Sequence, residues 1–249
     1  MAVVYISGVS KGIGRELARR YLERPDHIVV GSIRDDTTPE VETLKNTVPA
    51  SGSKLILVHN ECTNPDDTKK AFDDVVASGI NHFDIIIANA GGSPNVKPLD
   101  VVGPDDMIYD FQVNAVAPLV LFQTFKPLLE KSTKSPKWIS VTTAGGSISL
   151  METVRSWVGP AYGASKAALN WITCAIHFEN KWLTAVAIHP GLVQTGPGNW
   201  VARTFGNLPM APVTIEHCVD RMLDIIDNAT REETSGKYIR STDGTEMTW

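Results

Sequence analysis

The sequence has 249 residues, enough to bury one large hydrophobic core. Its 23 basic and 28 acidic side chains give a formal net charge of −5, with no block of basic residues, which argues against binding to nucleic acid or to an anionic membrane surface. No apolar run is long enough to span a bilayer, and the first residues read as a strand rather than a signal peptide, so we expect a soluble, cytoplasmic protein with a small-molecule partner. Cys62, Cys174 and Cys218 have no disulfide or metal-ligand spacing, and we expect reduced thiols and no bound metal.

The chain begins with a pattern typical of a nucleotide-binding site. An apolar run at residues 3–7 leads into a glycine-rich loop, and a helical pattern follows. Glycines permit a tight turn and close approach of the backbone to a pyrophosphate, which the positive end of a helix attracts. The loop could be simple turn punctuation, but its place after the first strand favours a dinucleotide site. The candidate cofactor-binding residues here are Gly8, Ser10, Lys11, Gly12, Ile13 and Gly14.

Cofactor discrimination is expected at the end of the second strand, residues 28–33. Many NAD-binding proteins have an acidic residue there for the ribose 2′-hydroxyl, but this chain has Arg34. Arg34 and Lys11 would bring two cations from separate loops to a 2′-phosphate. Asp35 and Asp36 follow directly, and a solvated loop charge is the alternative. The sequence therefore predicts NADP(H) as the cofactor.

The third and fourth strands, at residues 54–58 and 84–88, lead into further candidate cofactor contacts. Glu61 and Cys62 follow the third strand. The fourth is a continuous apolar run of the kind buried on both faces of a parallel sheet, and it leads into Asn89-Ala90-Gly91. Small residues there leave room for a cofactor, while Asn89 can hydrogen-bond to the neighbouring strands.

A helical pattern runs from Pro104 to about Lys131, and we expect Pro118 and Pro127 to interrupt or bend it. Asn114 lies in its middle, where a buried asparagine is disfavoured unless it has a specific role. Taken alone, Asn114 would be assigned a structural role.

A later helix, expected from Ala161 to about Phe178, carries Tyr162 and Lys166 one turn apart on the same face. A nearby ammonium favours the phenolate over the phenol, so the pair can provide an acid with a reachable pKa. Bringing a tyrosine from near ~10 to neutrality requires about 4 kcal/mol, more than one ammonium supplies, and a cationic nicotinamide ring could contribute the rest. The spacing alone is also common in ordinary packed helices.

With the GxxxGxG loop and Asn89-Ala90-Gly91, the Tyr162/Lys166 pair makes the chain resemble the short-chain dehydrogenase/reductase family, from the first strand through at least Thr195. The resemblance implies a Rossmann-type α/β fold, a single domain over residues 1–249. Its doubly wound parallel sheet would have about seven strands, with helices on both faces.

The resemblance also implies cofactor contacts. Glu61 and Cys62 match the positions beside the adenine, and Asn89, Ala90 and Gly91 match the cofactor wall. A sixth strand at residues 184–188 precedes a match to the family pattern PGxVxT, in which the residues expected at the nicotinamide carboxamide are Pro190, Gly191, Val193 and Thr195.

Catalytic roles follow from the same resemblance. Tyr162 would donate a proton to a carbonyl oxygen, Lys166 would lower the tyrosine pKa and bind ribose, and Asn114 would hold a water linked to Lys166. The family ends its fifth strand, here residues 137–143, with two serines, the second catalytic, and this chain has Thr142 and Thr143 instead.

A threonine at the catalytic position offers the same hydroxyl with an added methyl that restricts χ1. Thr143 is therefore the expected catalytic hydroxyl. Ser147 and Ser149 are the alternatives, because the segment before Tyr162 is several residues longer than usual.

Two segments are expected to surround the substrate: an apolar loop at residues 147–160, which could also be an ordinary surface flap, and a lid at residues 196–213. That loop and the ending at residues 243–249 resemble the carbonyl-reductase branch that includes fungal norsolorinic acid ketoreductase-like proteins. We therefore expect an NADPH-dependent ketone or aldehyde reductase that also catalyses the reverse reaction, alcohol oxidation, with aromatic or polyketide-like ketones as first candidates. The family's habit suggests a homodimer or homotetramer. The alternatives are an NAD-dependent alcohol dehydrogenase and a non-catalytic NADP-binding regulator.

Overall fold

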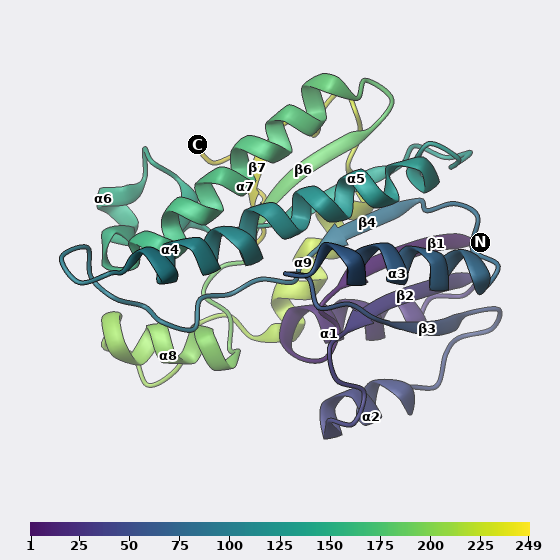
Figure 1. Ribbon diagram of the computed structural model, residues 1–249, viewed down its shortest axis with the longest axis horizontal. Coiled ribbons are helices and arrows are strands. Elements are labelled where there is room, and N and C mark those ends of the chain that lie inside the picture. Colours follow the sequence, from purple (N-terminus) through teal and green to yellow (C-terminus); the bar gives the residue numbers. More distant parts are fainter.

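A computed structural model describes residues 1–249 as a seven-stranded parallel sheet with helices on both faces (Figure 1). The strand order is β3-β2-β1-β4-β5-β6-β7. The strands are β1 (Ala2–Ser7), β2 (His27–Ile33), β3 (Lys54–His59), β4 (Ile85–Ala88), β5 (Lys137–Val141), β6 (Thr184–His189) and β7 (Tyr238–Arg240). The order reverses between β1 and β4, and in such sheets ligands bind beyond the carboxyl ends of the strands at this switch point. The expected fold class is confirmed.

The helices are α1 (Gly12–Leu22), α2 (Pro39–Lys45), α3 (Pro65–Ala77), α4 (Pro104–Phe111), α5 (Ala117–Leu129), α6 (Met151–Val154), α7 (Pro160–Glu179), α8 (Gly196–Phe205) and α9 (Ile215–Asn228). Shorter turns are the π-helical η1 (Gln112–Val116) and the 3₁₀ turns η2 (Ala144–Gly146) and η3 (Ser156–Val158). None of the helices is both long and apolar enough to cross a membrane.

The core consists of two layers, one on each face of the sheet. In β1, Val4 and Ile6 pack in the layer that contains the buried faces of α1 and α9, while Val3 and Tyr5 pack in the layer formed with α3 and α5. Both faces are covered because successive strand side chains point to opposite sides. This explains why the strands are continuously apolar instead of alternating, as the sequence indicated for β4.

The long helix expected from Pro104 is irregular at a different position from the one predicted. Pro127 lies inside α5 without interrupting it, and the irregular turn is η1, centred on Asn114. Pro118 has no backbone N–H, so it cannot complete the usual bond to the carbonyl of Asn114. The N–H of Ala117 instead reaches the carbonyl of Gln112, five residues back, which widens the helix to a π-turn.

Other differences concern element boundaries. The strand expected through residue 143 ends at Val141, so Thr142 and Thr143 lie just beyond β5, at the carboxyl edge of the sheet. The segment expected to be a lid contains a helix, α8, that its glycines and prolines did not suggest. These shifts matter because they place the candidate site residues in the loops that follow the strands.

Candidate active site

The glycine loop after β1 has a conformation that only glycine accommodates easily. Gly8 and Gly12 have φ of 73° and 60°, in the left-handed region. A Cβ on Gly14 would lie 2.3 Å from the carbonyl oxygen of Gly8 and 2.4 Å from Nδ2 of Asn89, and a Cβ on Gly8 would lie 3.2 Å from Cα of Ala90. The loop is therefore pressed against the end of β4.

The first turn of α1, which follows this loop, is open to an anion. Its N-cap residue, Lys11, makes no side-chain capping bond, and the turn contains no acidic residue. The amides of Gly12, Ile13 and Gly14 thus lie at an uncapped, positively polarised helix end. Ser10 is half-buried in the same loop. These features fit the pyrophosphate of a dinucleotide.

Asn89, in the loop after β4, links this loop to the end of β1 by hydrogen bonds. Its Nδ2 donates to the carbonyl oxygens of Ser7 at 2.9 Å and Gly8 at 3.2 Å, and its backbone N–H donates to Oγ of Ser7 at 2.9 Å. The side chain expected to bond to neighbouring strands therefore does so. Its contacts hold the ends of β1 and β4 at the switch point.

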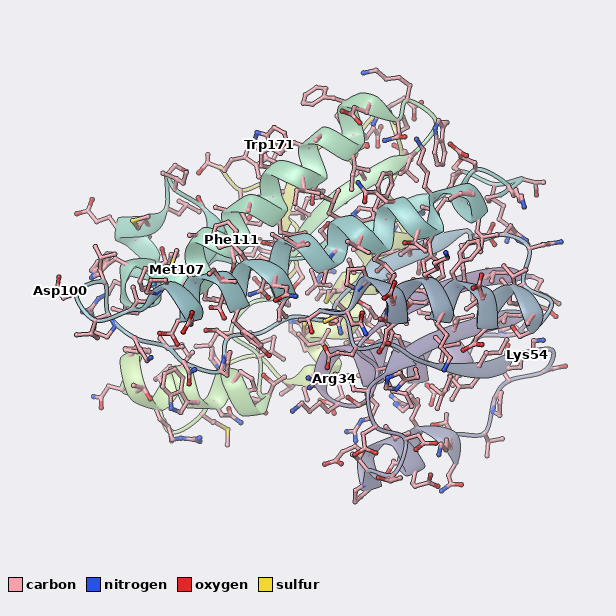
Figure 2. All side chains as sticks on the ribbon, viewed as in Figure 1. Arg34, Lys54, Asp100, Met107, Phe111 and Trp171 are labelled. Carbon is pink, nitrogen blue, oxygen red and sulfur yellow. The ribbon has the colours of Figure 1, made fainter.

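Arg34 and Glu61 approach each other at the ends of β2 and β3. The Arg34 side chain, labelled in Figure 2, is 66% exposed, and its Nη1 lies 3.6 Å from Oε2 of Glu61. Glu61 also accepts a 3.1 Å bond from the Thr63 hydroxyl. Beside it, burial raises the pKa of the Cys62 thiol, so this cysteine remains a neutral thiol. The Arg34 guanidinium is therefore accessible to a ligand, although it also pairs with the Glu61 carboxylate.

Tyr162, Lys166, Asn114 and Gly91 meet beyond the end of β4. Lys166 is 3% exposed, and its Nζ donates to the carbonyl of Val141 at 3.0 Å and lies 6.0 Å from the centroid of the Tyr162 ring. A Cβ on Gly91 would lie 2.8 Å from Oδ1 of Asn114 and 3.1 Å from Nζ of Lys166. Gly91 is thus required for the asparagine and the lysine to approach the same point.

The π-turn places Asn114 fully inside this cluster. Its Oδ1 accepts from the N–H of Gly92 at 2.9 Å, and its Nδ2 donates to the carbonyl of Gly92 at 2.8 Å and to Oγ of Ser165 at 3.1 Å. Asn114 is 0% exposed. The side chain therefore joins the helix to the loop after β4 and to α7, one residue from Lys166.

Burial controls the protonation of the pair on α7. It raises the pKa of Tyr162 to about 12, with a smaller contribution from the charge of Asp110, and it lowers the pKa of Lys166 to about 8. The sequence predicted that Lys166 would lower the tyrosine pKa. The pKa of Tyr162 is instead raised, because desolvation of the phenolate dominates and the ammonium of Lys166 is directed to the carbonyl of Val141.

The sequence reasoning missed Asp110. This residue is 2% exposed, its Oδ2 has no hydrogen-bond partner, and burial raises its carboxyl pKa. It precedes Asn114 by four residues, just as Tyr162 precedes Lys166, so the two pairs occupy successive turns of the packed helices α4–η1 and α7. An acidic residue one turn before a buried asparagine was the available signal.

The structure separates the candidate hydroxyls after β5. Thr142 donates to Oδ1 of Asn170 at 2.7 Å in the interior. Oγ1 of Thr143 accepts from the N–H of Gly145 at 3.2 Å, which leaves the hydroxyl proton available to another acceptor. The hydroxyls of Ser147 and Ser149 donate to Thr248, to its carbonyl at 2.7 Å and its Oγ1 at 2.6 Å.

The turn that begins at Thr143 packs directly on the helix of Tyr162. A Cβ on Gly163 would lie 3.0 Å from the carbonyl oxygen of Gly145, and one on Gly146 would lie 2.9 Å from Cβ of Lys166. The close approach places η2 against the first two turns of α7. Thr143 therefore lies on the same side of the site as Tyr162 and Lys166, beyond the carboxyl ends of the strands.

The PGxVxT segment after β6 lies opposite the glycine loop. A Cβ on Gly12 would be 3.5 Å from Cγ2 of Thr195. Oγ1 of Thr195 accepts from the N–H of Gly198 at 3.1 Å and caps α8. Gly191 has a φ of 87°, and Pro190 and Val193 are buried. The two candidate cofactor loops thus face each other, as one bound dinucleotide requires.

Exposed apolar side chains flank this edge on two elements. The segment of α6 and η3, between Thr143 and Tyr162, exposes Trp157 by 46%, and α8 exposes Trp200 and Phe205 by 41% each. The Trp200 and Phe205 rings are in edge-to-face contact, with centroids 5.5 Å apart. Both elements lie at the carboxyl side of the sheet in Figure 1.

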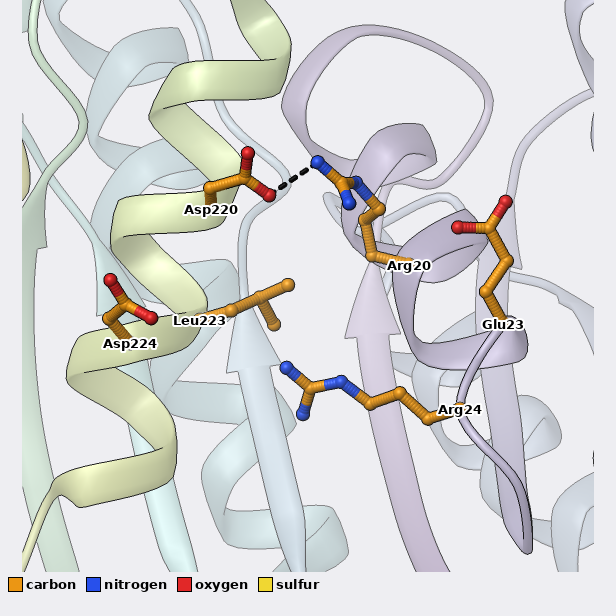
Figure 3. Close-up of a pocket in the computed structure, with 6 residues that line it drawn as sticks. All are labelled: Arg20, Glu23, Arg24, Asp220, Leu223 and Asp224. Carbon is orange, nitrogen blue, oxygen red and sulfur yellow. Dashed lines mark hydrogen bonds and ion pairs between the residues drawn. The ribbon is translucent and has the colours of Figure 1, made fainter.

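A separate surface crevice between α1 and α9 is shown in Figure 3. It is lined by Arg20, Glu23, Arg24, Asp220, Leu223 and Asp224. Arg20 pairs with Asp220 across it, and Arg24 forms a two-bond pair with Asp227 at 2.8 and 2.9 Å. The arginines are therefore already paired with carboxylates, and the crevice contains none of the candidate site residues.

Comparison with known proteins agrees with this geometry. The family model described as short chain dehydrogenase matches residues 2–202. The short-chain dehydrogenase srdF of Neurospora crassa is 50% identical over 249 residues, covering 99% of this chain and 97% of that protein. Norsolorinic acid ketoreductase of Aspergillus parasiticus is 36% identical, covering 99% of this chain and 91% of its own.

A solved structure is similar over the whole chain. The NADPH-bound carbonyl reductase from chicken fatty liver superimposes with a TM-score of 0.86 and 26% identity, covering 100% of both chains. The family match and the similarity of the solved structure therefore agree on the family and on the fold. The chain belongs to the short-chain dehydrogenases, oxidoreductases that act on small molecules with a nicotinamide cofactor.

Proposed function

We propose that this protein is an NADPH-dependent carbonyl reductase that converts a ketone or aldehyde to an alcohol. The observation that carries the proposal is the meeting of Tyr162, Lys166 and Asn114 at Gly91, next to an uncapped helix end and a glycine loop. This arrangement supplies a proton donor, a cation and a place for a dinucleotide at a single edge of the sheet.

The proposed chemistry assigns the proton to Tyr162 and the hydride to the cofactor. A bound nicotinamide would supply the hydride for the carbonyl carbon; as the C=O π bond breaks, the phenol of Tyr162 would give its proton to the oxygen and become a phenolate. Lys166 would stabilise the resulting phenolate and bind the ribose, and Asn114 would hold a water that links the lysine to solvent. The Thr143 hydroxyl would donate to the same oxygen as negative charge develops there.

The residues proposed to hold the cofactor fall into four groups. The pyrophosphate would lie at the glycine loop, the adenine beside Glu61 and Cys62, the nicotinamide ribose beside the Asn89-Ala90-Gly91 wall, and the carboxamide at the PGxVxT segment. A preference for NADP(H) is supported by Arg34, which is accessible, and by the exposed Lys11. The similar chicken enzyme is described with NADPH. An NAD-dependent alcohol dehydrogenase would be expected to have an acidic residue in place of Arg34.

A bulky aromatic ketone is the substrate class that we propose. Trp157, Trp200 and Phe205 provide aromatic surface on both sides of the site, and three relatives between 34% and 36% identical are norsolorinic acid ketoreductases. Residues 196–213, which include α8, are proposed to be the lid over this substrate. Aromatic pocket walls of this type favour flat apolar ligands.

The experiment measures NADPH oxidation with a panel of ketones, aldehydes and quinones, for the parent protein and for Tyr162→Phe. The parent should consume NADPH with aromatic ketones, and the variant should lose about 10²-fold or more in kcat while still binding NADPH. A non-catalytic regulator would bind NADPH and consume none with any compound. Normal turnover by Tyr162→Phe would show that another group donates the proton.

The same assay tests the role of the Thr143 hydroxyl with two substitutions. Thr143→Ser keeps the hydroxyl and should retain most activity, whereas Thr143→Val keeps the shape and should lose about 10²-fold in kcat. If Ser147 or Ser149 supplied the catalytic hydroxyl, Thr143→Val would be nearly normal and one of the serine-to-alanine variants would be inactive.

A further inference from the structure

The carbonyl oxygen of Thr143 has a buried hydrogen-bond partner that lies 95 residues further along the chain. The hydroxyl of Tyr238, on β7, donates a hydrogen bond to it. Tyr238 is 0% exposed, and its pKa is raised because the ring is buried, so the hydroxyl stays protonated and remains a donor. This bond fixes the backbone of Thr143 immediately beyond the end of β5.

The segment Thr245–Trp249 packs over the same region. The ring of Trp249 stacks on Tyr238, with centroids 5.1 Å apart and an interplanar angle of 21°. The N–H of Met247 donates to the carbonyl of Tyr238 at 2.6 Å. The segment therefore holds the tyrosine from its outer side, near α6 and the start of α7 (Figure 1).

The same segment also binds the far end of the turn that Thr143 begins. Ser147, which is 1% exposed, donates to the carbonyl of Thr248 at 2.7 Å. The hydroxyl of Ser149 donates to Oγ1 of Thr248 at 2.6 Å, and the N–H of Ser149 donates to the carbonyl of Trp249 at 3.2 Å. The turn is thus held at Thr143 by Tyr238 and at residues 147–149 by Thr248 and Trp249.

The chemistry of threonine makes this support relevant to catalysis. A β-branched side chain has few accessible χ1 rotamers, so the direction of the Thr143 hydroxyl follows from the position of its backbone. The turn that it begins, η2, has three residues, and within it Thr143 accepts only from the N–H groups of Gly145 and Gly146, so these bonds fix Thr143 relative to the turn but not relative to the rest of the site. An outside support is required to keep the hydroxyl aimed at one point.

We propose that Tyr238, Trp249 and the main chain of Thr248 form a clamp that positions the Thr143 hydroxyl for carbonyl reduction. The inference rests on the proposed function, in which that hydroxyl donates to the reacting oxygen. Tyr238 and Trp249 are positioning residues, because they act through Thr143 and touch neither substrate nor cofactor in this assignment.

Tyr238→Phe is the most selective test, because it removes one hydroxyl and keeps the ring that stacks on Trp249. We expect kcat to fall about tenfold, less than for loss of the Thr143 hydroxyl itself, since a displaced group retains part of its effect. The NADPH dissociation constant should stay within about twofold of the parent value, because the clamp lies outside the proposed cofactor loops.

Trp249→Ala tests the stacking, and Trp249→Phe tests its rescue. The alanine variant should lower kcat about as much as Tyr238→Phe, and the phenylalanine variant should restore most of it because a ring still covers Tyr238. Trp182→Ala is the matched control. Trp182 is 39% exposed against 38% for Trp249, but it precedes the amino end of β6, whereas Thr143 lies beyond the carboxyl end of β5, and its loss should leave kcat unchanged.

A double-mutant cycle separates positioning from general support of the fold. If Tyr238 acts only through the Thr143 hydroxyl, Tyr238→Phe should cost less than about twofold in kcat when it is added to Thr143→Val. A further tenfold loss in that background would overturn the inference. Unchanged kcat in both Tyr238→Phe and Trp249→Ala would also overturn it, while leaving carbonyl reduction intact. A parent protein that consumes no NADPH with any compound would instead refute the proposed function.

Discussion

Arg34 has two competing partners, the carboxylate of Glu61 at 3.6 Å and the proposed 2′-phosphate of the cofactor. Arg34→Asp replaces charge-assisted bonds to a dianion by repulsion, so the preference for NADPH over NADH should collapse or reverse. Dissociation constants for both cofactors measure this. Equal affinities in the parent protein would contradict the assignment of NADP(H).

Glu61→Gln provides the matched control for Arg34. Removing the carboxylate frees the guanidinium from its pair, and NADPH should bind a few-fold more tightly, by the roughly 0–1 kcal/mol expected of an exposed ion pair. The affinity for NADH should change less, because NADH presents no 2′-phosphate. An equal gain in affinity for both cofactors would indicate that Glu61 acts on the adenine, which both cofactors carry, and not through Arg34.

Asp110 gives a pH prediction at the same scale. Its carboxylate adds to burial in raising the Tyr162 pKa, and Asp106 on the preceding turn acts on Asp110 in the same direction. Alcohol oxidation requires the phenolate, so its rate rises as pH increases through the Tyr162 pKa. Asp110→Asn removes the negative charge and should move that midpoint to lower pH. An unchanged midpoint in the pH profile would mean that Asp110 is already protonated.

Some candidate site residues could be grouped directly from the sequence because they lie close together in it. Tyr162 with Lys166, and the glycine loop after β1, are separated by a few positions, so helix and turn geometry bring their members together. Asp110 and Tyr238 were missed for a physical reason. Tyr238 reaches Thr143 across 95 residues through the pairing of β6 with β7, and no short spacing encodes such a contact.

At the scale of elements, the strands were predicted within one or two residues, because continuous apolar runs mark strands buried on both faces. The break in the long helix was misplaced, because a proline's effect was expected at its own position. The missing N–H of Pro118 acts four residues earlier, at Asn114. The helix α8 was missed because its cap, from Thr195 to Gly198, lies in a stretch rich in glycine and proline.

The segment of α6 and η3 is predicted to select the substrate. Trp157 is 46% exposed, and the guanidinium of Arg155 lies 5.9 Å from its ring centroid. Trp157→Ala removes aromatic contact area, so KM for bicyclic ketones should rise roughly tenfold, while KM for a small aliphatic ketone should change little. Equal changes for both substrates would indicate that η3 is only a surface flap.

For the whole molecule, one face is suited to a second copy of the chain. The helices α4, α5 and α7 lie side by side on the near face in Figure 1, and Trp171 is labelled on that face in Figure 2. Their exposed apolar side chains are Ile108, Tyr109, Trp171 and Phe178. These exposed apolar side chains on neighbouring helices are our basis for proposing the homo-oligomer expected from the family resemblance.

Trp171→Glu tests this surface because Trp171 is its most exposed aromatic residue, at 73%. A charge placed in an apolar interface should shift the protein toward monomer, which light scattering after size-exclusion chromatography measures. Trp182→Glu, in the loop between α7 and β6 and outside the three helices of the face, should leave the mass unchanged. A monomeric parent protein would contradict the homo-oligomer.

The π-turn at Asn114 determines how α4 is rotated about the helix axis relative to α5. The inward positions Asp106, Asp110, Asn114 and Pro118 recur every four residues, whereas an undistorted α-helix repeats every 3.6. Over three turns the excess is about one residue, equivalent to a single insertion. If the same residues formed a regular α-helix and α5 stayed in the core, the preceding turns would be rotated by about 100° about the helix axis. Asp110 would then leave the vicinity of Tyr162, so the widened turn is what keeps Asp110 and Asn114 on one face of the helix.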